Sequence, residues 1–352
     1  MRLYIGIDAG WESMRYEVRN AKDHRIKRGG IAATPEALEK LLKTYEKVRD
    51  VQVAFESGTQ MYWMDNVVKQ MGMDSYPFHA AHFFPAGKSK NKTDKKDAER
   101  IAHSAVKHDL PERIVIPEEG ERQLREKMSE REGYKKELTT LVNRLHALTV
   151  SQGLAIKKGR LTESAESWDL VIEQLNEEAQ PKAKRLYTVA LSLMQVLEML
   201  EDEIREMIER KDWKPAFTRV TSIPGIGFWT AVVLLAWCGP KAARFKSSRQ
   251  AASYFGLVGK AYQSGKTKRM GHITKAGPPI ARRIFTQAAH AFLRSEGGRS
   301  SRWGEWYERF TCSRTRRKKI ALVGLTRKIV TAAVACLRNE TVWDNSYVEE
   351  AG

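Results

Sequence analysis

The sequence predicts an α/β domain at the amino end, followed by a mostly helical remainder. Short apolar runs alternate with helical patterns between residues 2 and 79. Long charged stretches with apolar residues at helical spacing then fill the middle of the chain. The last part is strongly basic and contains a hairpin signal between helices.

The α/β domain begins with the strand "RLYIGIDA", whose apolar residues alternate and whose exit carries Asp8. Two further strands, "SMRYEVRN" and "HRIKRGGIAA", follow as a meander. "TPEALEKLLKTYEKV" is a helix with a Thr cap and Pro at its first position. "VQVAFES" is a buried strand ending in Glu56, and a helix "TQMYWMDNVVKQMG" and a strand "SYPFHA" follow. The order β-β-β-α-β-α-β is the ribonuclease H-like layout, which we assign to residues 1–117.

Residues 118–212 are predicted to form an antiparallel helical arm. Two long stretches combine apolar stripes with Glu and Lys, and a shorter helix between them is expected to end at Pro181. Such an arm usually serves as a spacer or for oligomerisation. It resembles a coiled coil without a regular heptad pattern.

Residues 213–340 are predicted to form a basic, mostly helical domain, with a tail at 341–352. "SIPGIGFWTAVVLLAWCG" fits either a helix-hairpin-helix turn whose amides meet phosphates or an ordinary tight turn between packed helices. The residues leave both interpretations open. A helix, a basic hairpin, another helix and a final basic amphipathic helix follow.

All of the excess positive charge lies in this C-terminal part. Residues 213–352 hold 25 Lys and Arg against 7 Asp and Glu, whereas residues 1–212 hold 36 of each. A field of this size favours a polyanion, and nucleic acid is the leading choice because no membrane-spanning run is apparent. The absence of a signal-peptide pattern and of CxxC spacing around Cys238, Cys312 and Cys336 favours a cytoplasmic protein with reduced thiols.

Four acids are candidate metal ligands. Asp8 and Glu56 leave strands expected to be parallel neighbours, and Asp94 and Asp97 share one face of a helix predicted to begin near Thr93. Clustered carboxylates repel one another unless cations lie between them, and oxygen ligands suit Mg²⁺ or Mn²⁺. Each acid alone is better explained by a structural role, but together they favour a metal site. Basic residues beside them are candidate phosphate contacts: Lys88, Lys90, Lys92, Lys95 and Lys96.

Ser264 lies in the basic segment "YQSGKTKRMGHITKAG". A hydroxyl needs a base or a metal to become a nucleophile, and no His/Asp pair is adjacent, so the residues alone favour a turn-forming serine. If Ser264 shared a site with metal ions bound by the four acids, a role as nucleophile would be favoured instead. Cations expected to hold DNA or RNA backbones are Lys266, Lys268, Arg269, Lys275, Arg282 and Arg283.

Most of the chain resembles the Asp-Glu-Asp-Asp transposases of the insertion-sequence one-hundred-and-ten family, which also contains site-specific DNA invertases. The resemblance rests on "IGIDAG", "FESG" and "KTDKKDAERIA" in the first part, and on "IPGIGFWTA", "RFKSSRQAASYFGLV", "QSGKTKRMGHITKAG" and "ARRIF" in the second. Relatives often have "SSGG" where this chain has "QSGK".

The resemblance implies a RuvC-like first domain in which Asp8, Glu56, Asp94 and Asp97 bind Mg²⁺. It also implies that Ser264 attacks DNA and forms a phosphoserine intermediate. The implied partners are donor and target DNA, a noncoding bridge RNA that guides recognition, and a homodimer that pairs into a tetrameric synapse. The arm would contribute to dimerisation, and one protomer's acids would join another's serine.

Two other functions remain open at this stage. A junction-resolving endonuclease would use metal-activated water and leave Ser264 idle. A nucleic-acid-binding scaffold would carry out no catalysis. Sugar kinases share the sheet, but they carry a Gly-Thr phosphate loop where this chain has "DAGWES", so we set them aside.

Overall fold

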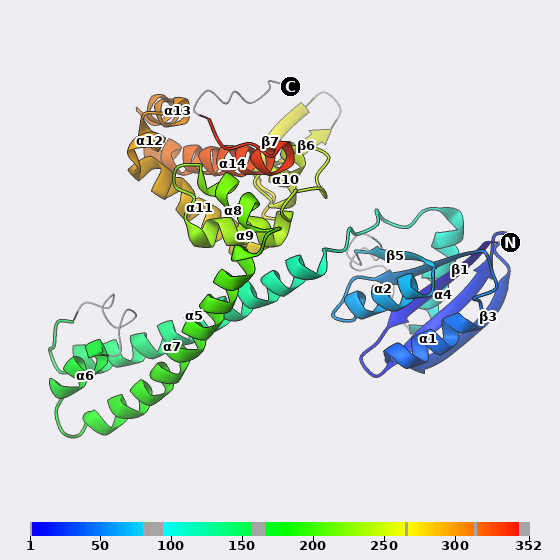
Figure 1. The fold of residues 1–352 in the computed structure, drawn as a ribbon, viewed down its shortest axis with the longest axis horizontal. Helices are drawn as coiled ribbons and strands as arrows, with labels where there is room; N and C mark the ends of the chain where they lie inside the picture. Colours follow the sequence, from blue (N-terminus) through cyan, green and yellow to red (C-terminus); the bar gives the residue numbers. More distant parts are fainter. Residues whose placement is uncertain are drawn as a thin grey trace. The chain divides into compact units, whose positions relative to one another are not determined.

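The computed structural model describes residues 2–79, 83, 94–156, 166–264, 267–312 and 315–344. The chain divides into two compact units, Met1–Ile116 and Pro117–Gly352 (Figure 1). Each unit has hydrophobic clusters of its own. The finer division into three domains and a tail stays a prediction.

The first unit is built on one mixed sheet of five strands in the order β3-β2-β1-β4-β5. The β1 strand pairs antiparallel with β2 and parallel with β4, and β4 pairs parallel with β5. The observed element order confirms the predicted β-β-β-α-β-α-β succession. The bounds are β1 Arg2–Ala9, β2 Ser13–Asn20, β3 Arg25–Ala32, α1 Pro35–Lys43, β4 Asp50–Glu56, α2 Met61–Gln70, β5 Asp74–Phe78 and α4 Asp94–Lys107.

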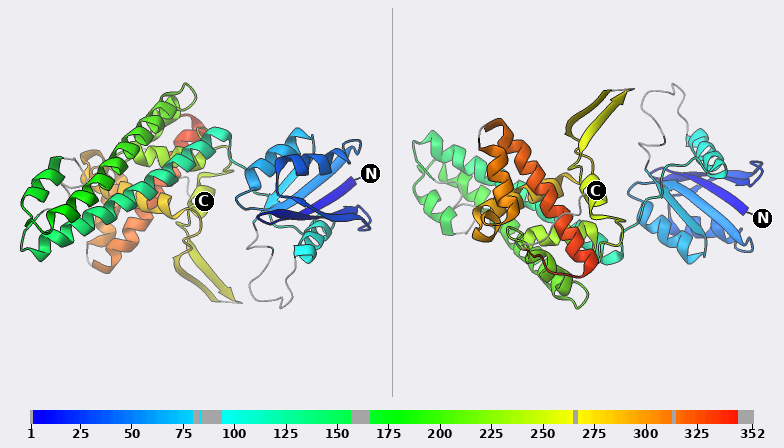
Figure 2. Two further views of the ribbon diagram at one scale, coloured as in Figure 1. Left: turned by 90° about the horizontal axis from the view of Figure 1, so that it is seen from below. Right: turned by 90° about the horizontal axis from the view of Figure 1, so that it is seen from above.

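Helices cover both faces of this sheet. Figure 2 shows α1 and α2 on one face of the sheet. This face packs against them through a cluster that includes Ile5, Val53 and Leu38. The other face packs against α4 through Tyr4, Ala54 and neighbouring residues. Helix α1 begins as predicted, because the Thr34 hydroxyl accepts a hydrogen bond from the Ala37 amide at 3.3 Å and Pro35 occupies the first turn.

The arm of the second unit consists of two long antiparallel helices and a short one. Helices α5 (Glu119–Ser151) and α7 (Gln180–Glu209) pack along each other, and α6 (Glu166–Glu173) lies against them. The predicted helix end at Pro181 is wrong: Pro181 lies in the first turn of α7, where its missing N–H costs no helical hydrogen bond.

The remaining helices of the second unit enclose its main core. The buried helix α9 and the long α14 lie at its centre. In the described part of the chain, one stretch, Arg317–Asn339 of α14, has the length and apolar character of a membrane span, and 67% of its apolar window is buried inside the unit. The bounds are α8 Lys214–Thr221, α9 Phe228–Cys238, α10 Ser248–Tyr254, β6 Gly259–Ser264, β7 Thr267–Ile273, α11 Pro279–Arg294, α12 Glu296–Arg299, α13 Arg302–Thr311 and α14 Thr315–Asn339.

The three cysteines are free thiols. Cys238 and Cys336 are buried, whereas Cys312 is exposed. Burial raises the pKa of Cys238 to about 12 and that of Cys336 to about 11. These two thiols are therefore protonated and inert near neutral pH.

Candidate metal centre and nucleophile

Side-chain alternation places Asp8 and Glu56 on the same face of the sheet. Strands β1 and β4 run parallel with Ile7 opposite Phe55, so the next residues, Asp8 and Glu56, lie side by side at the strand exits. Parallel neighbours are about 4.8 Å apart. Ile7 and Phe55 belong to the cluster under α1 and α2, so the two acids point to the face covered by α4. Both carboxylates are partly exposed.

Helix α4 runs antiparallel to β1, so its first turn lies at the exit end of the strand. Tyr4, near the start of β1, packs on His108 just beyond the end of the helix, with ring centroids 6.1 Å apart. Further along β1, Gly6 lies against Ala98: a Cβ on this glycine would stand 2.6 Å from the Ala98 carbonyl oxygen. Residues of β1 that are closer to the strand exit therefore lie against earlier residues of α4. The first turn of α4, which carries Asp94 and Asp97, is on the side of the strand exit.

Ion pairs hold α4 in this position. Glu99 accepts from Arg19 of β2 at 3.3 Å and from Arg28 of β3 at 3.4 Å. The His103 Nδ1 lies 2.7 Å from an oxygen of Asp23, in the turn between these strands. This turn is at the opposite end of the sheet from Asp8, which agrees with the antiparallel direction of the helix.

The donor chemistry at this edge fits a divalent cation. The strand exits and the first turn of α4 supply carboxylate oxygens, the ligands that Mg²⁺ and Mn²⁺ prefer. Among the side chains that the structure describes, no three His, Cys, Asp or Glu groups stand close enough to form a metal cluster. The Asp94 side chain and residues 84–93 are outside that set.

Ser264 ends strand β6, at the tip of the β6–β7 hairpin. Its backbone pairs with Thr267, and the hairpin register continues through Tyr262 opposite Arg269. The side chain of Ser264 lies outside the described atoms. Because the acids belong to the first unit and Ser264 to the second, the prediction that they share a site is untested.

The predicted nucleic-acid contacts have different environments. Arg269 and Lys275 are exposed, on β7 and just after it. Arg282 donates to the carbonyl of Gly277 at 2.9 Å, which braces the loop before α11, and Arg283 pairs with Glu132 of α5. The other predicted contacts are outside the described residues or have undescribed side chains: Lys88, Lys90, Lys92, Lys95, Lys266 and Lys268.

The sequence analysis did not identify Trp11, an exposed residue at the acidic edge, by which we mean the end of the sheet that carries Asp8 and Glu56. Trp11, in the turn between β1 and β2, is 86% exposed. The turn is held by hydrogen bonds from the Gly10 amide to the Ser13 carbonyl at 3.1 Å and from the Gln60 side chain to the Gly10 carbonyl at 2.9 Å. An exposed tryptophan next to a candidate ligand in "DAGWES" was the available signal.

Two family models match the chain. Residues 5–152 match the DEDD transposase model of IS110, described as "Transposase". Residues 218–303 match a model described as "Transposase IS116/IS110/IS902 family". The first match contains Asp8, Glu56, Asp94, Asp97 and all of α5, and the second contains the Ser264 hairpin.

Several relatives are transposases. The chain is 28% identical over 241 residues to the transposase for insertion sequence element IS1111A of Coxiella burnetii, an alignment that covers 67% of this chain and 64% of the relative. It is 26% identical to the transposase for IS1328 of Yersinia enterocolitica, over 72% of this chain and 74% of that protein. A probable family 20 transposase of Pseudomonas aeruginosa is 25% identical, over 83% and 85%. The chain thus spans less than two thirds of the Coxiella relative.

Proposed function

Since the chain belongs to the IS116/IS110 family of transposases, we propose that it cuts and exchanges DNA strands to move an insertion element. One observation carries this proposal. Asp8 and Glu56 lie side by side on the sheet face under α4, at the end where the first turn of α4 brings Asp94 and Asp97. Carboxylates that a divalent cation drew together at this end of the sheet would be suited to metal-dependent phosphodiester chemistry.

The acids would hold Mg²⁺ or Mn²⁺. Asp8, Glu56, Asp94 and Asp97 supply oxygen ligands, and the bound ion supplies Lewis-acid stabilisation of charge at the scissile phosphate. The contact of α4 with Gly6 and the ion pairs of Glu99 to β2 and β3 would hold the first turn of the helix, and with it Asp94 and Asp97, near the strand exits. Lys96, exposed on the same helix turn, would approach the phosphate backbone.

Ser264 would be the nucleophile. Its Oγ forms a bond to the phosphorus while the bond from phosphorus to one sugar oxygen breaks. The serine loses its proton and the departing sugar oxygen takes one up, so a phosphoserine and a free sugar hydroxyl result with no net release of protons. In rejoining, a hydroxyl of another strand attacks the phosphoserine and Ser264 regains its proton. The position of Ser264 at a hairpin tip, two residue pairs from exposed Arg269, supports a role in contacting DNA.

The partners that we propose are donor DNA, target DNA and a noncoding guide RNA. The net charge of +18, all of it located in residues 213–352, supports binding of polyanions. We further propose a homodimer that pairs into a tetramer, so that acids of one protomer and Ser264 of another act together. The cytoplasm is the compartment in which such an activity meets chromosomal DNA.

The acids are tested with a supercoiled plasmid that carries the gene and its native flanks. Asp8→Asn and Asp97→Asn are expected to reduce strand cleavage in Mg²⁺ at least about a hundredfold, and chelation of the metal is expected to stop it. Asp50→Asn is the matched control, because Asp50 begins β4 at the opposite edge of the sheet. Equal activity of Asp97→Asn and Asp50→Asn, with nucleic-acid affinity intact, would favour the non-catalytic scaffold.

The serine is tested by trapping a covalent protein–DNA product under denaturing conditions. Ser264→Ala is expected to abolish this product and strand cleavage together, while Ser253→Ala, an exposed serine on α10, retains both. Cleavage that persists in Ser264→Ala without a covalent product would favour the junction-resolving endonuclease.

The guide is tested by sequencing RNA that copurifies with the protein. One short structured species, partly complementary to the element ends and to the insertion site, is the expected result. A random sample of cellular RNA would contradict the guided mechanism without affecting the metal and serine predictions.

A further inference from the structure

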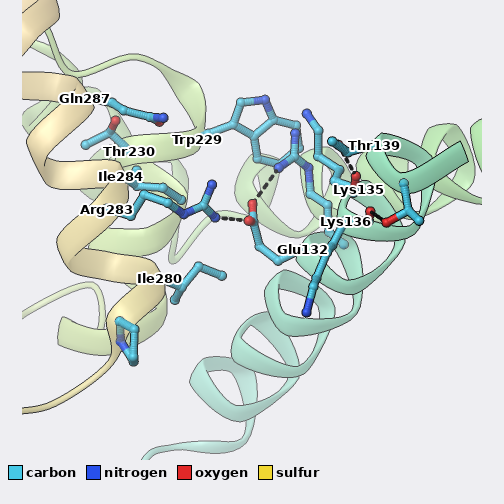
Figure 3. Close-up of a pocket in the computed structure, with 13 residues that line it drawn as sticks. Glu132, Lys135, Lys136, Thr139, Trp229, Thr230, Ile280, Arg283, Ile284 and Gln287 are labelled. Atoms are coloured by element: carbon cyan, nitrogen blue, oxygen red, sulfur yellow. Dashed lines mark hydrogen bonds and ion pairs between the residues drawn. The ribbon is translucent and has the colours of Figure 1, made fainter. Parts of the chain in front are cut away.

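A cavity of about 840 Å³ lies within the second unit, between α5, α9 and α11 (Figure 3). This volume is within the range of about 300–1,000 Å³ that is typical of ligand sites. Its walls come from the middle of α5 and from the first turns of α9 and α11. The lining side chains include Arg131, Lys135, Lys136, Trp229, Ile280 and Arg283.

The walls carry more positive than negative charge. Four cations line the cavity, and Glu132 is the one acid among the lining residues. Glu132 forms ion pairs with two of these cations: it pairs with Arg283 across the cavity (Figure 3), and it lies 3.3 Å from Arg131. Within the described part of the chain, neither Lys135 nor Lys136 forms an ion pair. The two ammonium groups are therefore not held in ion pairs, although the nearby charge of Glu201 acts on Lys135.

Arg131 lines the cavity with a side chain that is held in place by its neighbours. Its side chain is 4% exposed, its Nε donates to Glu201 at 2.7 Å, and its guanidinium lies 3.4 Å from the centre of the Trp229 ring. Burial lowers the pKa of Arg131, and Glu201 opposes this effect. Burial also lowers the pKa of Lys135, and the nearby charge of Arg131 adds to it. Bringing an anion to this site would relieve the crowding of positive charge.

Two helix amino ends add to the positive field. Helix α9 begins at Phe228 and α11 at Pro279, and neither has a side-chain cap or an acid in its first turn. Uncapped amino ends carry partial positive charge and free N–H groups. The hydroxyls of Thr139 and Thr140 donate to carbonyls of α5, at 2.7 and 3.0 Å. Among the four lining cations, Arg131 and Arg283 form ion pairs, so the two lysines are the cations that can turn toward a ligand.

We propose that this cavity binds the phosphate backbone of a nucleic-acid strand, with Lys135 and Lys136 as the contacting residues and the Arg131–Trp229 pair as their support. The proposal rests on the proposed function, which requires nucleic-acid partners, and adds a binding site in which the arm and the basic domain act together. The cavity binds backbone and leaves sequence recognition to other contacts, because its donors are charged and none is directed by a fixed base-reading geometry. It has no part in strand cleavage.

The test measures binding of a fluorescein-labelled single-stranded oligonucleotide, made as DNA and as RNA of one mixed sequence, by the full chain. In the double variant Lys135→Gln/Lys136→Gln, the Kd is expected to rise at least about tenfold. The slope of log K against log salt is expected to fall by about 1.4, since each single-strand phosphate contact contributes about 0.7. Arg131 is left intact, because its loss would unpair Glu201 and threaten folding.

The matched control is Lys182→Gln/Lys184→Gln, which removes the same charge from exposed positions on α7. Its salt slope and Kd are expected to stay close to those of the unmodified chain. Equal losses in the two double variants would mean that only long-range charge matters, and would overturn the site. Failure of the unmodified chain to bind either oligonucleotide would instead overturn the proposed function itself.

Acylation of lysine amines, read by mass spectrometry, provides a second measurement. Lys135 and Lys136 are expected to react in the free protein and to be protected by the oligonucleotide. Protection by sodium tripolyphosphate but not by the oligonucleotide would assign the cavity to a small polyphosphate and overturn the proposal. Protection that disappears on dilution without nucleic acid would assign it to a second copy of the chain, with the same consequence.

Discussion

Single residues decide the chemistry available at two places in this molecule. At the sheet edge, strict alternation along β1 and β4 turns Asp8 and Glu56 away from the apolar cluster that holds Ile7 and Phe55. In the helical unit, Glu121 shows the opposite situation, since it is 7% exposed and accepts from Arg244 at 2.7 Å. An acid at the sheet edge can bind a cation from solvent, whereas Glu121 is a structural anion.

Glu121 is expected to make stability depend on pH. Burial raises its pKa and outweighs the lowering effects of Arg244 and Arg125. A carboxyl whose pKa is raised on folding contributes stability below its unfolded pKa and loses that contribution as the pH rises through the folded value. The free energy of unfolding of the natural chain minus that of Glu121→Gln should therefore fall as the pH rises above the ordinary carboxyl pKa of about 4.

Urea unfolding at several pH values measures this difference. Glu178→Gln, which removes an exposed carboxylate from the same unit, is the control. A difference that grows with rising pH in Glu121→Gln would show that the ion pairs with Arg244 and Arg125 dominate over burial.

At the scale of elements, the approach of α4 to β1 determines whether the four acids can meet. The contact is close because Gly6 has no side chain: a Cβ there would stand 2.6 Å from the Ala98 carbonyl oxygen and closer still to the Ala102 amide nitrogen. These neighbours are backbone atoms of a helix, so they cannot turn aside. The ion pairs from Arg19 and Arg28 to Glu99 then set the position of the helix along the strand.

Gly6→Ala is expected to lower the free energy of unfolding of the first unit by about 1–3 kcal/mol, the usual cost of overpacking. The methyl group would push α4 away from β1 and displace its first turn. Gly58→Ala is the control, because a Cβ at Gly58 meets no atom within 4 Å, and its effect should stay within about 0.5 kcal/mol. Denaturant unfolding followed by circular dichroism measures both, and equal effects would show that the close contact can relax.

At the scale of the whole molecule, two units with separate cores divide the work between them. The acidic edge belongs to Met1–Ile116, whereas the basic hairpin and the cavity belong to Pro117–Gly352. The excess positive charge lies within the second unit as well. The proposed polyanion binding and the proposed metal binding thus belong to different units.

Separate expression of residues 1–116 and 117–352 is expected to give two folded fragments. Each has its own buried clusters, so each should unfold in one cooperative transition by calorimetry. The second fragment should keep the affinity for the labelled oligonucleotide, and the first should bind at least about tenfold more weakly. An unfolded first fragment would show that the two units depend on each other for stability.

Much of the local structure was predictable from neighbouring residues. The strand "RLYIGIDA" coincides with β1, and the Thr34 cap and Pro35 mark the start of α1, because alternation and capping are local properties. The end predicted at Pro181 failed for a related reason. Proline is compatible with a first helical turn as well as with a terminus, and the preceding residues do not distinguish these cases.

The sequence by itself determined which residues carry charge, which strand positions face one way and the location of the basic region, since these depend on residue type and on the period of two along a strand. Only the tertiary structure decided that α4 runs antiparallel to β1 and that α5, α9 and α11 come together around an open cavity lined by Lys135 and Arg283. These residues are far apart along the chain. Their proximity depends on which apolar faces pack together, and no local pattern specifies that choice.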